Sequence, residues 1–345
     1  MADEAAAVGR ARKLCIMTTL VTGASGFIGS AVVRKLLKRR HDVRALVRKT
    51  SQTSNLEALS IDIAVGDLTD RASLCRAIRG CDTLFHVAAD YRLWVPQAAK
   101  MIETNVNGTR NLMEIAGELG VRRIVYTSSV ATLGLLKDAT PADEDTPVRG
   151  EDMIGPYKRS KFRAEALVRE MVTKQGLPVV IVNPSTPIGP RDIKPTPTGK
   201  IVVEAASGRM PAFVDTGLNV VHVDDVAEGH VLALEHGVVG ERYILGGQNL
   251  TLEEILKIIA KLTRQKPPRI RIPHNAVVPM AAMAELWARL TGKEPFATLD
   301  GVELARKKMF FSSARAMGSL GYHPRPANEA IADAVSWFQQ HNYLH

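Results

Sequence analysis

The feature that most constrains the fold of this chain is a set of three glycines at three-residue spacing, Gly23, Gly26 and Gly29. A short apolar run ends at Gly23, and an amphipathic segment follows Gly29. This order predicts a strand, a tight turn and a helix. Gly23 allows the sharp turn, Gly26 lets backbone amides approach a pyrophosphate, and Gly29 lets the helix pack closely on the strand. Because a helix N-terminus offers free N–H groups to phosphates, the pattern predicts a dinucleotide-binding turn.

Apolar and amphipathic segments alternate along the next part of the chain. After the strand that precedes the turn, further buried strands are expected at residues 43–47, 61–65, 83–88, 124–128 and 179–182. Helices are expected between most of them, at residues 71–79, 98–119 and 156–174. Continuous apolar strands that alternate with helices predict an α/β fold, a doubly wound parallel sheet of the Rossmann type covered on both faces.

The character of the chain changes after residue 183, where five prolines fall within fourteen residues. We expect a Rossmann domain at residues 17–183, completed by about 218–245. A smaller substrate-binding lid is expected from residues 184–217 and 246–345, interleaved with the first domain. Residues 1–16 are expected to be a disordered extension. Helices are expected near residues 200–207, 251–264, 275–290 and 328–340, and a strand at 220–225 should lead into a helix ending near 236.

Composition excludes several classes of protein. No run of eighteen apolar residues is present, so no transmembrane helix is expected, and residues 5–8 are too short for a signal-peptide core. The three cysteines, Cys15, Cys75 and Cys81, have no metal or redox spacing, which predicts no metal site and a cytoplasmic protein. The net charge is +9, but only 5% of residues are aromatic and no basic run is interleaved with them, so no nucleic-acid partner is expected.

Two segments raise the question of a surface partner. Residues 306–311 combine basic and apolar side chains, which could touch a membrane surface or an anionic substrate, or could pack with a solvated edge. The helix expected at 275–290 carries a stripe of large apolar residues: Val277, Val278, Met280, Met283, Leu286, Trp287 and Leu290. We expect this stripe to lie in the core rather than on a membrane or cofactor surface.

The sharpest chemical signal is the pair Tyr157 and Lys161, which stand four residues apart on one expected helix and therefore share a face. Pro156 suits the first helical position. A free tyrosine has a pKa near 10, and a nearby ammonium favours the phenolate and lowers that pKa. Ser128 and Ser129 end the fifth expected strand, where ligands bind in a doubly wound sheet. A hydroxyl there could hydrogen-bond a substrate oxygen beside Tyr157.

These motifs together resemble the extended short-chain dehydrogenase/reductase superfamily. The resemblance rests on the glycine turn and on residues 66–68, 86–89, 127–129 and 157–161, and it covers nearly the whole chain from Met17. More narrowly, residues 88–94, 183–187, 194–199 and 305–311 resemble the bacterial hopanoid-associated sugar epimerase family, which is related to dihydroflavonol 4-reductases. At the end of the sixth strand, Asn183-Pro184 is closer to the reductase pattern than to that of nucleotide-sugar epimerases.

The resemblance implies a role for each matching residue. Tyr157 would be the general acid/base, Lys161 would lower its pKa and bind the nicotinamide ribose, Ser129 would polarise the substrate oxygen, and Asn105 would brace the active site. The remaining cofactor contacts implied are Gly23, Ser25, Gly26, Phe27, Ile28, Asp67, Leu68, Val87, Ala88, Ala89 and Pro184, with Asp67 and Leu68 at the adenine. Substrate contacts are expected at Tyr91, Arg92, Ser185 and Thr186.

The residue at the end of the second strand predicts which dinucleotide is preferred. In this fold an acidic residue there binds the ribose hydroxyls of NAD, whereas a basic one accommodates the 2′-phosphate of NADP. Arg48 holds the position, with Lys49 next, and no acidic residue lies between Val43 and Gln52. We therefore expect a preference for NADP(H), with use of either cofactor as the alternative if Arg48 only caps the strand end.

We expect an NAD(P)H-dependent oxidoreductase that interconverts a carbonyl and a secondary alcohol, which the resemblance places in hopanoid lipid side-chain metabolism. Its substrate would be a small molecule such as a polyhydroxylated lipid side chain or a sugar. One alternative is a sugar epimerase that oxidises a hydroxyl transiently and recycles its cofactor. A weaker alternative is a non-catalytic dinucleotide sensor. The helices at 98–119 and 156–174 could form a homodimer contact, by analogy with relatives.

Overall fold

A seven-stranded parallel sheet forms the centre of the protein. The computed structural model describes residues 18–90, 98–293, 295 and 297–344. The strands follow the order β10-β6-β5-β4-β1-β2-β3, and every neighbouring pair runs parallel. This confirms the expected Rossmann-type sheet. Their bounds are β1 Thr18–Thr22, β2 Asp42–Val47, β3 Asp62–Val65, β4 Thr83–His86, β5 Arg123–Thr127, β6 Val179–Pro184 and β10 Arg242–Leu245.

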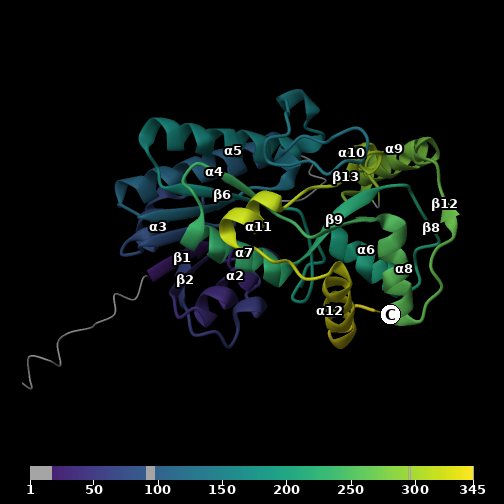
Figure 1. Cartoon of the computed structure of the whole chain (residues 1–345), viewed down its shortest axis with the longest axis horizontal. Coiled ribbons are helices and arrows are strands. Elements are labelled where there is room, and N and C mark those ends of the chain that lie inside the picture. Colours follow the sequence, from purple (N-terminus) through teal and green to yellow (C-terminus); the bar gives the residue numbers. More distant parts are fainter. Residues whose placement is uncertain (1–17, 91–97, 294, 296, 345) are drawn as a thin grey trace, which may run out of the picture.

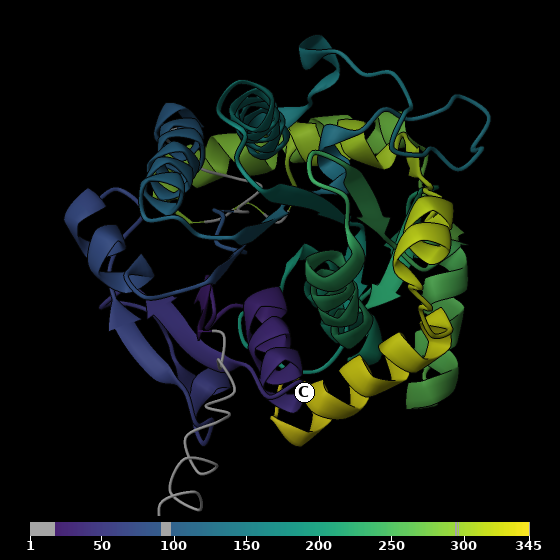
Figure 2. The same ribbon diagram turned by 60° about the vertical axis from the view of Figure 1, so that its left-hand side comes forward.

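Helices cover the sheet on both sides, as Figure 1 and Figure 2 show. On one side α2 (Phe27–Lys38) packs against α7 (Val223–His236), and α11 (Ala314–Leu320) contacts α7. On the other side lie α3 (Arg71–Ile78), α4 (Ala98–Glu118) and α5 (Gly155–Gln175). Successive strand residues point to opposite cores, as Leu20 and Val21 do in β1. No helix in the described part of the chain is long and apolar enough to cross a membrane.

The strand β3 departs from the expected burial. It is the last strand of the sheet, and Ile63 and Val65 are 45% and 51% exposed. The expectation that residues 61–65 form a buried strand is therefore wrong, because an edge strand has a neighbour on only one side. Apolar composition alone does not distinguish an edge strand from a central one.

A second, smaller sheet is built from parts of the C-terminal half. Its strands are β7 (Thr186–Ile188), β9 (Gly217–His222), β11 (Gln248–Thr251) and β13 (Lys308–Met309). The strands β7, β11 and β13 each pair with β9, and this sheet is separate from the central one. Three helices form its core: α6 (Pro197–Ala206), α8 (Leu252–Thr263) and α12 (Ala327–Gln340). β9 thus belongs to the second sheet, whereas α7 packs against α2 and β10 pairs with β6 of the first sheet.

The remaining elements are short strands, helices and 3₁₀ turns outside the two sheets. Three 3₁₀ turns occupy Ser54–Leu56, Val130–Thr132 and Gly150–Asp152. A two-stranded pair, β8 (Ala212–Phe213) and β12 (Ile270–Arg271), leads into α9 (His274–Thr291), and α10 (Leu299–Ala305) packs against α9. The helix α8 begins with a capping box in which Thr251 Oγ1 accepts from the Glu254 N–H at 3.2 Å.

The two candidate surface segments differ in how they lie in the structure. In residues 306–311, Phe311 is buried and Met309 packs against the same cluster, so this segment contributes to packing. The large side chains of α9 instead point outward: Met283, Leu286, Trp287 and Leu290 are each more than 60% exposed. The expectation that the α9 stripe lies in the core is therefore wrong, and the buried face of α9 is made of alanines, Ala281, Ala284 and Ala288.

Candidate active site

The glycine turn between β1 and α2 has little space around its backbone. Gly23 adopts φ +66°, and a Cβ there would lie 2.8 Å from the backbone of Ala88. A Cβ on Gly29 would lie 2.0 Å from the Gly23 carbonyl oxygen. The Gly26 N–H donates to the same oxygen at 2.9 Å. Gly23 therefore makes the turn and Gly29 permits close packing of the helix, as the spacing predicts.

The N-terminus of α2 suits an anion. Its N-cap, Gly26, is exposed and has no side chain to cap the helix, and the first turn carries no acidic residue. The first N–H groups of a helix have no partner within it, which leaves those of Phe27 and Ile28 directed out of the turn. Ser25 lies beside them, and its carbonyl accepts from Asn55 Nδ2 at 3.3 Å. This geometry fits the pyrophosphate of a dinucleotide.

The variant Gly26→Val should fold but lose most of its dinucleotide affinity. A Cβ on Gly26 would meet the Gly23 carbonyl oxygen at 3.2 Å, a close contact that a small shift of the turn relieves. The added branches would stand in front of the α2 N-terminus, where phosphates approach. We expect Kd for NADPH to rise at least about 10-fold, measured by fluorescence titration, with an unchanged circular dichroism spectrum. Normal affinity in a folded variant would contradict this location of the cofactor.

Arg48 and Asp67 lie together at the same edge of the sheet. Arg48 is exposed directly after β2, and its charge contributes to lowering the pKa of Asp67. The larger cause of that lower pKa is hydrogen bonding from Thr69, whose hydroxyl and N–H donate to Asp67 Oδ1 at 2.7 and 2.9 Å. Leu68 packs against Gly108 of α4, where a Cβ would approach to 2.8 Å. A basic and an acidic residue thus flank the place expected for the adenine ribose.

The end of β4 closes the back of the glycine turn. Val87, Ala88 and Ala89 are half-buried there, and the Ala88 N–H donates to Thr22 Oγ1 at 3.2 Å. His86 is buried between two threonine hydroxyls, Thr22 at 2.9 Å and Thr109 at 3.0 Å. Burial, with a smaller effect of the Lys161 charge, lowers the pKa of His86 to about 3. His86 is therefore a neutral connector, which sequence reasoning did not assign.

Tyr157 and Ser129 meet at the carboxyl edge of the sheet. Tyr157 lies in the first turn of α5, where burial raises its pKa and a hydrogen bond with the Ser129 side chain lowers it. The Ser129 hydroxyl also accepts from the Ala131 N–H at 3.1 Å. The structure therefore brings together the two hydroxyls that the sequence predicts to share a substrate oxygen.

Lys161 is buried one turn further along α5. Its Nζ donates to the Thr127 carbonyl at 2.7 Å and lies 5.2 Å from the centre of the Tyr126 ring. Burial lowers the pKa of Lys161 to about 8, and the Glu165 charge opposes that change. The net pKa direction at Tyr157 is upward, opposite to the expectation from Lys161 alone, because desolvation of the phenol has the larger effect.

Asn105 acts through the backbone of its neighbours. Its Oδ1 accepts from the Asp90 N–H at 2.9 Å, and its Nδ2 donates to the Asp90 carbonyl at 3.0 Å and to Ser160 Oγ at 2.9 Å. It therefore ties the segment after β4 to the helix that carries Tyr157, which makes it a positioning residue. One small pocket is lined by Asn105 and Lys161 together with Ala88, Ala89, Thr109, Tyr126 and Ala164.

A buried polar network around Glu165 contacts the backbone of Ser129, and it was not predicted from the sequence. Glu165 Oε2 accepts from the Ser128 hydroxyl, from Thr132 Oγ1 at 2.8 Å and from Asn183 Nδ2 at 3.0 Å. Its other oxygen pairs with Arg242 Nη1 at 3.1 Å. Asn183 Nδ2 also donates to the Ser129 carbonyl, at 3.0 Å. The available signal was the spacing, because Glu165 follows Lys161 by four residues on the same face of α5.

Three of the remaining candidate residues are consecutive in the chain. Pro184 ends β6, Ser185 Oγ donates to the Asn219 carbonyl at 2.9 Å, and Thr186 begins β7. These three residues therefore lie where the chain passes from the first sheet to the second. Tyr91 and Arg92 lie outside the described residues.

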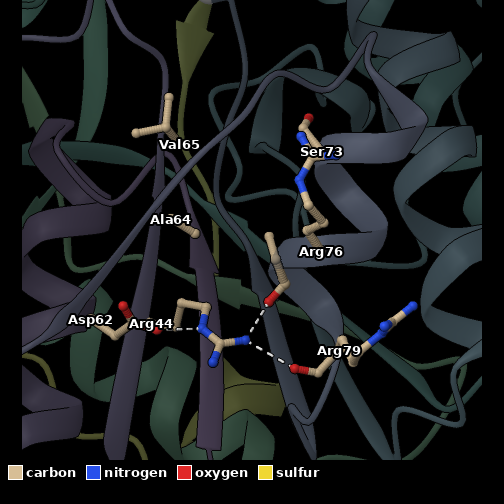
Figure 3. A pocket seen from close by; sticks show the side chains of 8 residues that line it. Arg44, Asp62, Ala64, Val65, Ser73, Arg76 and Arg79 are labelled. Carbon is tan, nitrogen blue, oxygen red and sulfur yellow. Dashed lines mark hydrogen bonds and ion pairs between the residues drawn. The ribbon is translucent and has the colours of Figure 1, made fainter.

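A further surface pocket lies between β2, β3 and α3, away from the glycine turn (Figure 3). Arg44 occupies it, donating to Asp62 Oδ2 at 2.6 Å and to the carbonyls of Ala77 and Arg79 at 2.8 and 3.0 Å. The guanidinium is thus used to hold the edge strand against α3, and the pocket shares no residue with the site around Tyr157.

A doubly wound sheet with this glycine turn, and with a tyrosine and a lysine on one helix at the same edge, defines an extended short-chain dehydrogenase/reductase. The chain belongs to the NAD dependent epimerase/dehydratase family, whose sequence model matches residues 19–246. It is accordingly an enzyme of the extended type, and the resemblance inferred from its motifs is confirmed.

Individual relatives cover almost the whole chain. A Synechocystis protein, named provisionally as a dihydroflavonol 4-reductase, is 44% identical over 94% of this chain and 95% of its own length. Sterol demethylase protein B of Methylococcus capsulatus is 35% identical over 95% of this chain and 100% of its own. The crystal structure of gox2253 is 53% identical, covers 95% of this chain and 99% of that one, and superposes with a TM-score of 0.87.

Proposed function

We propose that the protein is an NADP(H)-dependent oxidoreductase that interconverts a carbonyl and a secondary alcohol. The observation that carries this proposal is the meeting of Ser129 and Tyr157 at the carboxyl edge of the sheet, with Lys161 one turn further along α5 and the uncapped N-terminus of α2 after β1. A dinucleotide lying along that edge would present its nicotinamide ring to the two hydroxyls. The bound nicotinamide supplies or accepts the hydride, which is the chemistry that the side chains themselves lack.

The side chains move and hold the proton. Tyr157 gives its hydroxyl proton to the substrate oxygen during reduction and takes it back during oxidation. Ser129 donates a hydrogen bond to the same oxygen, which stabilises developing negative charge. Lys161 uses one of its three N–H groups on the Thr127 carbonyl, and the others can bind ribose hydroxyls and balance charge on Tyr157. Asn183 links Glu165 to Ser129, because its Nδ2 donates both to Glu165 Oε2 and to the Ser129 carbonyl. The buried network thereby holds the backbone of Ser129 in place.

The orientation of Asn183 favours a reductase over a sugar epimerase. Its side-chain nitrogen is engaged in the buried network, where it donates to the Ser129 carbonyl, Thr132 Oγ1 and Glu165 Oε2, and is therefore not free to bind a sugar. The sterol in the name of the Methylococcus relative supports a polycyclic lipid as substrate. We propose a polyhydroxylated hopanoid side chain, in agreement with the resemblance of residues 88–94 and 183–187.

Cofactor consumption distinguishes the two enzymatic functions. One portion of the purified protein is denatured to identify any dinucleotide that it carries. The intact protein is then incubated with NADPH and hopanoid side-chain precursors that carry a carbonyl group, and separately with NADP⁺ and the polyhydroxylated side chains. Stoichiometric loss of NADPH absorbance with reduction of the carbonyl to an alcohol is expected for the reductase. Inversion of a hydroxyl in the NADP⁺ incubation, without net formation of NADPH, would show the epimerase instead. Dinucleotide binding with neither reaction on any carbonyl substrate would favour the sensor.

The variant Arg48→Asp should reverse the preference for NADPH over NADH. The exposed guanidinium after β2 can make bidentate, charge-assisted hydrogen bonds to a 2′-phosphate, whereas a carboxylate would repel it and bind the ribose hydroxyls. We expect the ratio of the two Kd values to change by at least about 10-fold, measured by titration of both proteins. Lys38→Asp, a substitution at a basic residue at the far end of α2, serves as the control for net charge. Equal affinities in the wild type would contradict the NADP(H) preference.

A further inference from the structure

On α9 the large apolar side chains face the solvent, whereas on an ordinary surface helix they face the protein. The residues that face the protein are small alanines, Ala281, Ala284 and Ala288. The residues on the opposite face are large: Met280, Met283, Leu286, Trp287 and Leu290 are between 46% and 74% exposed. Their spacing of three and four residues makes one continuous stripe along the helix. A monomeric surface does not ordinarily expose so many large apolar side chains together.

Exposed basic residues lie on α9 and on the segment that leads into it. Arg289 is in the last turn of α9 and Lys293 follows the helix, and both are exposed. Arg269 and Arg271, at β12, are also exposed, and Arg271 pairs with Asp215. The one acidic residue of α9, Glu285, is turned towards α10, where its Oε1 accepts from the Leu299 N–H at 2.8 Å. Figure 1 places β12, which carries the exposed Ile270, at the same end of the molecule as α9. The C-terminal end of the stripe is thus accompanied by two exposed basic side chains, those of Arg289 and Lys293.

The helix α9 is firmly held to the protein, so the stripe is a fixed surface rather than a loose segment. The His274 ring nitrogen Nε2 lies 2.9 Å from the Asp215 carbonyl and 3.0 Å from that of Ala305. α10, which packs on α9, reaches Gly155 at the start of α5, where a Cβ would lie 2.9 Å from Asp300 Oδ2. The exposed stripe is therefore connected, through α10, to the start of the helix that bears Tyr157.

We propose that α9 docks on the surface of a bilayer containing anionic lipids. Methionine, leucine and tryptophan side chains would enter the boundary between headgroups and acyl chains, where tryptophan is enriched, while the arginines and lysines meet lipid phosphates. The basic charge favours an anionic membrane over a second copy of this basic chain, because two such faces would repel each other. The docking does not depend on which reaction the active site performs.

Vesicle flotation tests this inference with the full-length protein. The wild type is mixed with vesicles of phosphatidylcholine alone, or of equal parts phosphatidylcholine and phosphatidylglycerol. We expect binding to the anionic vesicles, weakened by high salt, because the attraction to the headgroups is screened. The triple variant Met283→Ser, Leu286→Ser, Leu290→Ser should lose at least about 10-fold in partitioning, since it removes apolar area that docking would bury in the bilayer. NADPH affinity and thermal unfolding should not change, because these side chains contact solvent.

A matched variant and a spectroscopic signal make the test specific. Val238→Ser with Val239→Ser removes two other exposed apolar side chains and should leave flotation unchanged. Trp287 fluorescence should shift to shorter wavelength on anionic vesicles, and Trp287→Phe should abolish the shift. Equal flotation of the wild type and the triple variant would overturn the proposal. So would conversion of a wild-type dimer to a monomer by the triple variant in size-exclusion chromatography, because a second copy would then cover the stripe.

Discussion

Replacement of Tyr157 by phenylalanine should lower kcat by at least about 100-fold while leaving the fold and NADPH affinity nearly intact. The hydroxyl is needed to move the proton on the substrate oxygen, whereas the ring only packs at the start of α5. Tyr157 is half-buried, and burial raises its pKa, so the hydroxyl stays protonated in the resting protein and is available as an acid. Loss of the proton donor therefore affects the chemical step rather than binding.

Single-turnover rates with saturating NADPH and carbonyl substrate measure this effect directly. The matched control is Tyr343→Phe, which removes a hydroxyl that donates to the Ile193 carbonyl at 2.7 Å in a different part of the fold. This control should retain the wild-type rate. If Tyr157→Phe keeps more than about a tenth of that rate, the general acid is another group.

Replacement of Lys161 by methionine should abolish activity and at the same time stabilise the protein. The ammonium is buried, and within the described part of the chain its Nζ donates a hydrogen bond to the Thr127 carbonyl, at 2.7 Å. Removal of a buried charge that lacks a close counter-ion commonly raises stability by on the order of 1 kcal/mol, even when one hydrogen bond is lost. Turnover should fall at least about 100-fold, and NADPH affinity should fall as well, because Lys161 is assigned to the ribose.

The gain in stability should depend on pH in a defined direction. The pKa of Lys161 is about 8 in the folded protein and has its ordinary value of 10.5 in the unfolded chain. Between these values the unfolded wild type binds more protons, so its free energy of unfolding rises with pH. The advantage of Lys161→Met in chemical denaturation should therefore be largest below pH 8 and shrink towards pH 10.5. Lys174→Met, at an exposed position on the same helix, should show neither the gain nor the pH dependence.

The parts of the site that sequence reasoning predicted are those with local causes. The turn at Gly23 and Gly29 follows from backbone conformation, and the pairing of Tyr157 with Lys161 follows from helical periodicity. Both depend on fewer than ten consecutive residues. The carboxyl edge of the sheet then brings Ser129 to Tyr157, because neighbouring parallel strands end at the same side.

The parts that could not be predicted depend on contacts between distant segments. Glu165 gains its role from Asn183 and Arg242, and no local pattern states that these side chains converge. The direction of the pKa shift at Tyr157 was likewise hidden, because burial depends on the whole fold. The orientation of α9 could not be predicted either. Periodicity identified an amphipathic helix there, but it could not say that alanines would face the protein and Trp287 the solvent.

The passage from β9 to α7 limits how the enzyme can be assembled during synthesis. His222 is both the last residue of β9 and the N-cap of α7, with its Nδ1 accepting from the Asp224 N–H at 2.9 Å, so no linker separates the two sheets. β10 (Arg242–Leu245), which completes the central sheet, pairs with β6 (Val179–Pro184), and β7 and β9 of the second sheet lie between them in the chain. A nascent chain that ends at residue 183 would expose the edge of β6 and the uncovered face of α2. The ribosome must therefore release β7 and β9 before β10 can complete the nucleotide-binding half.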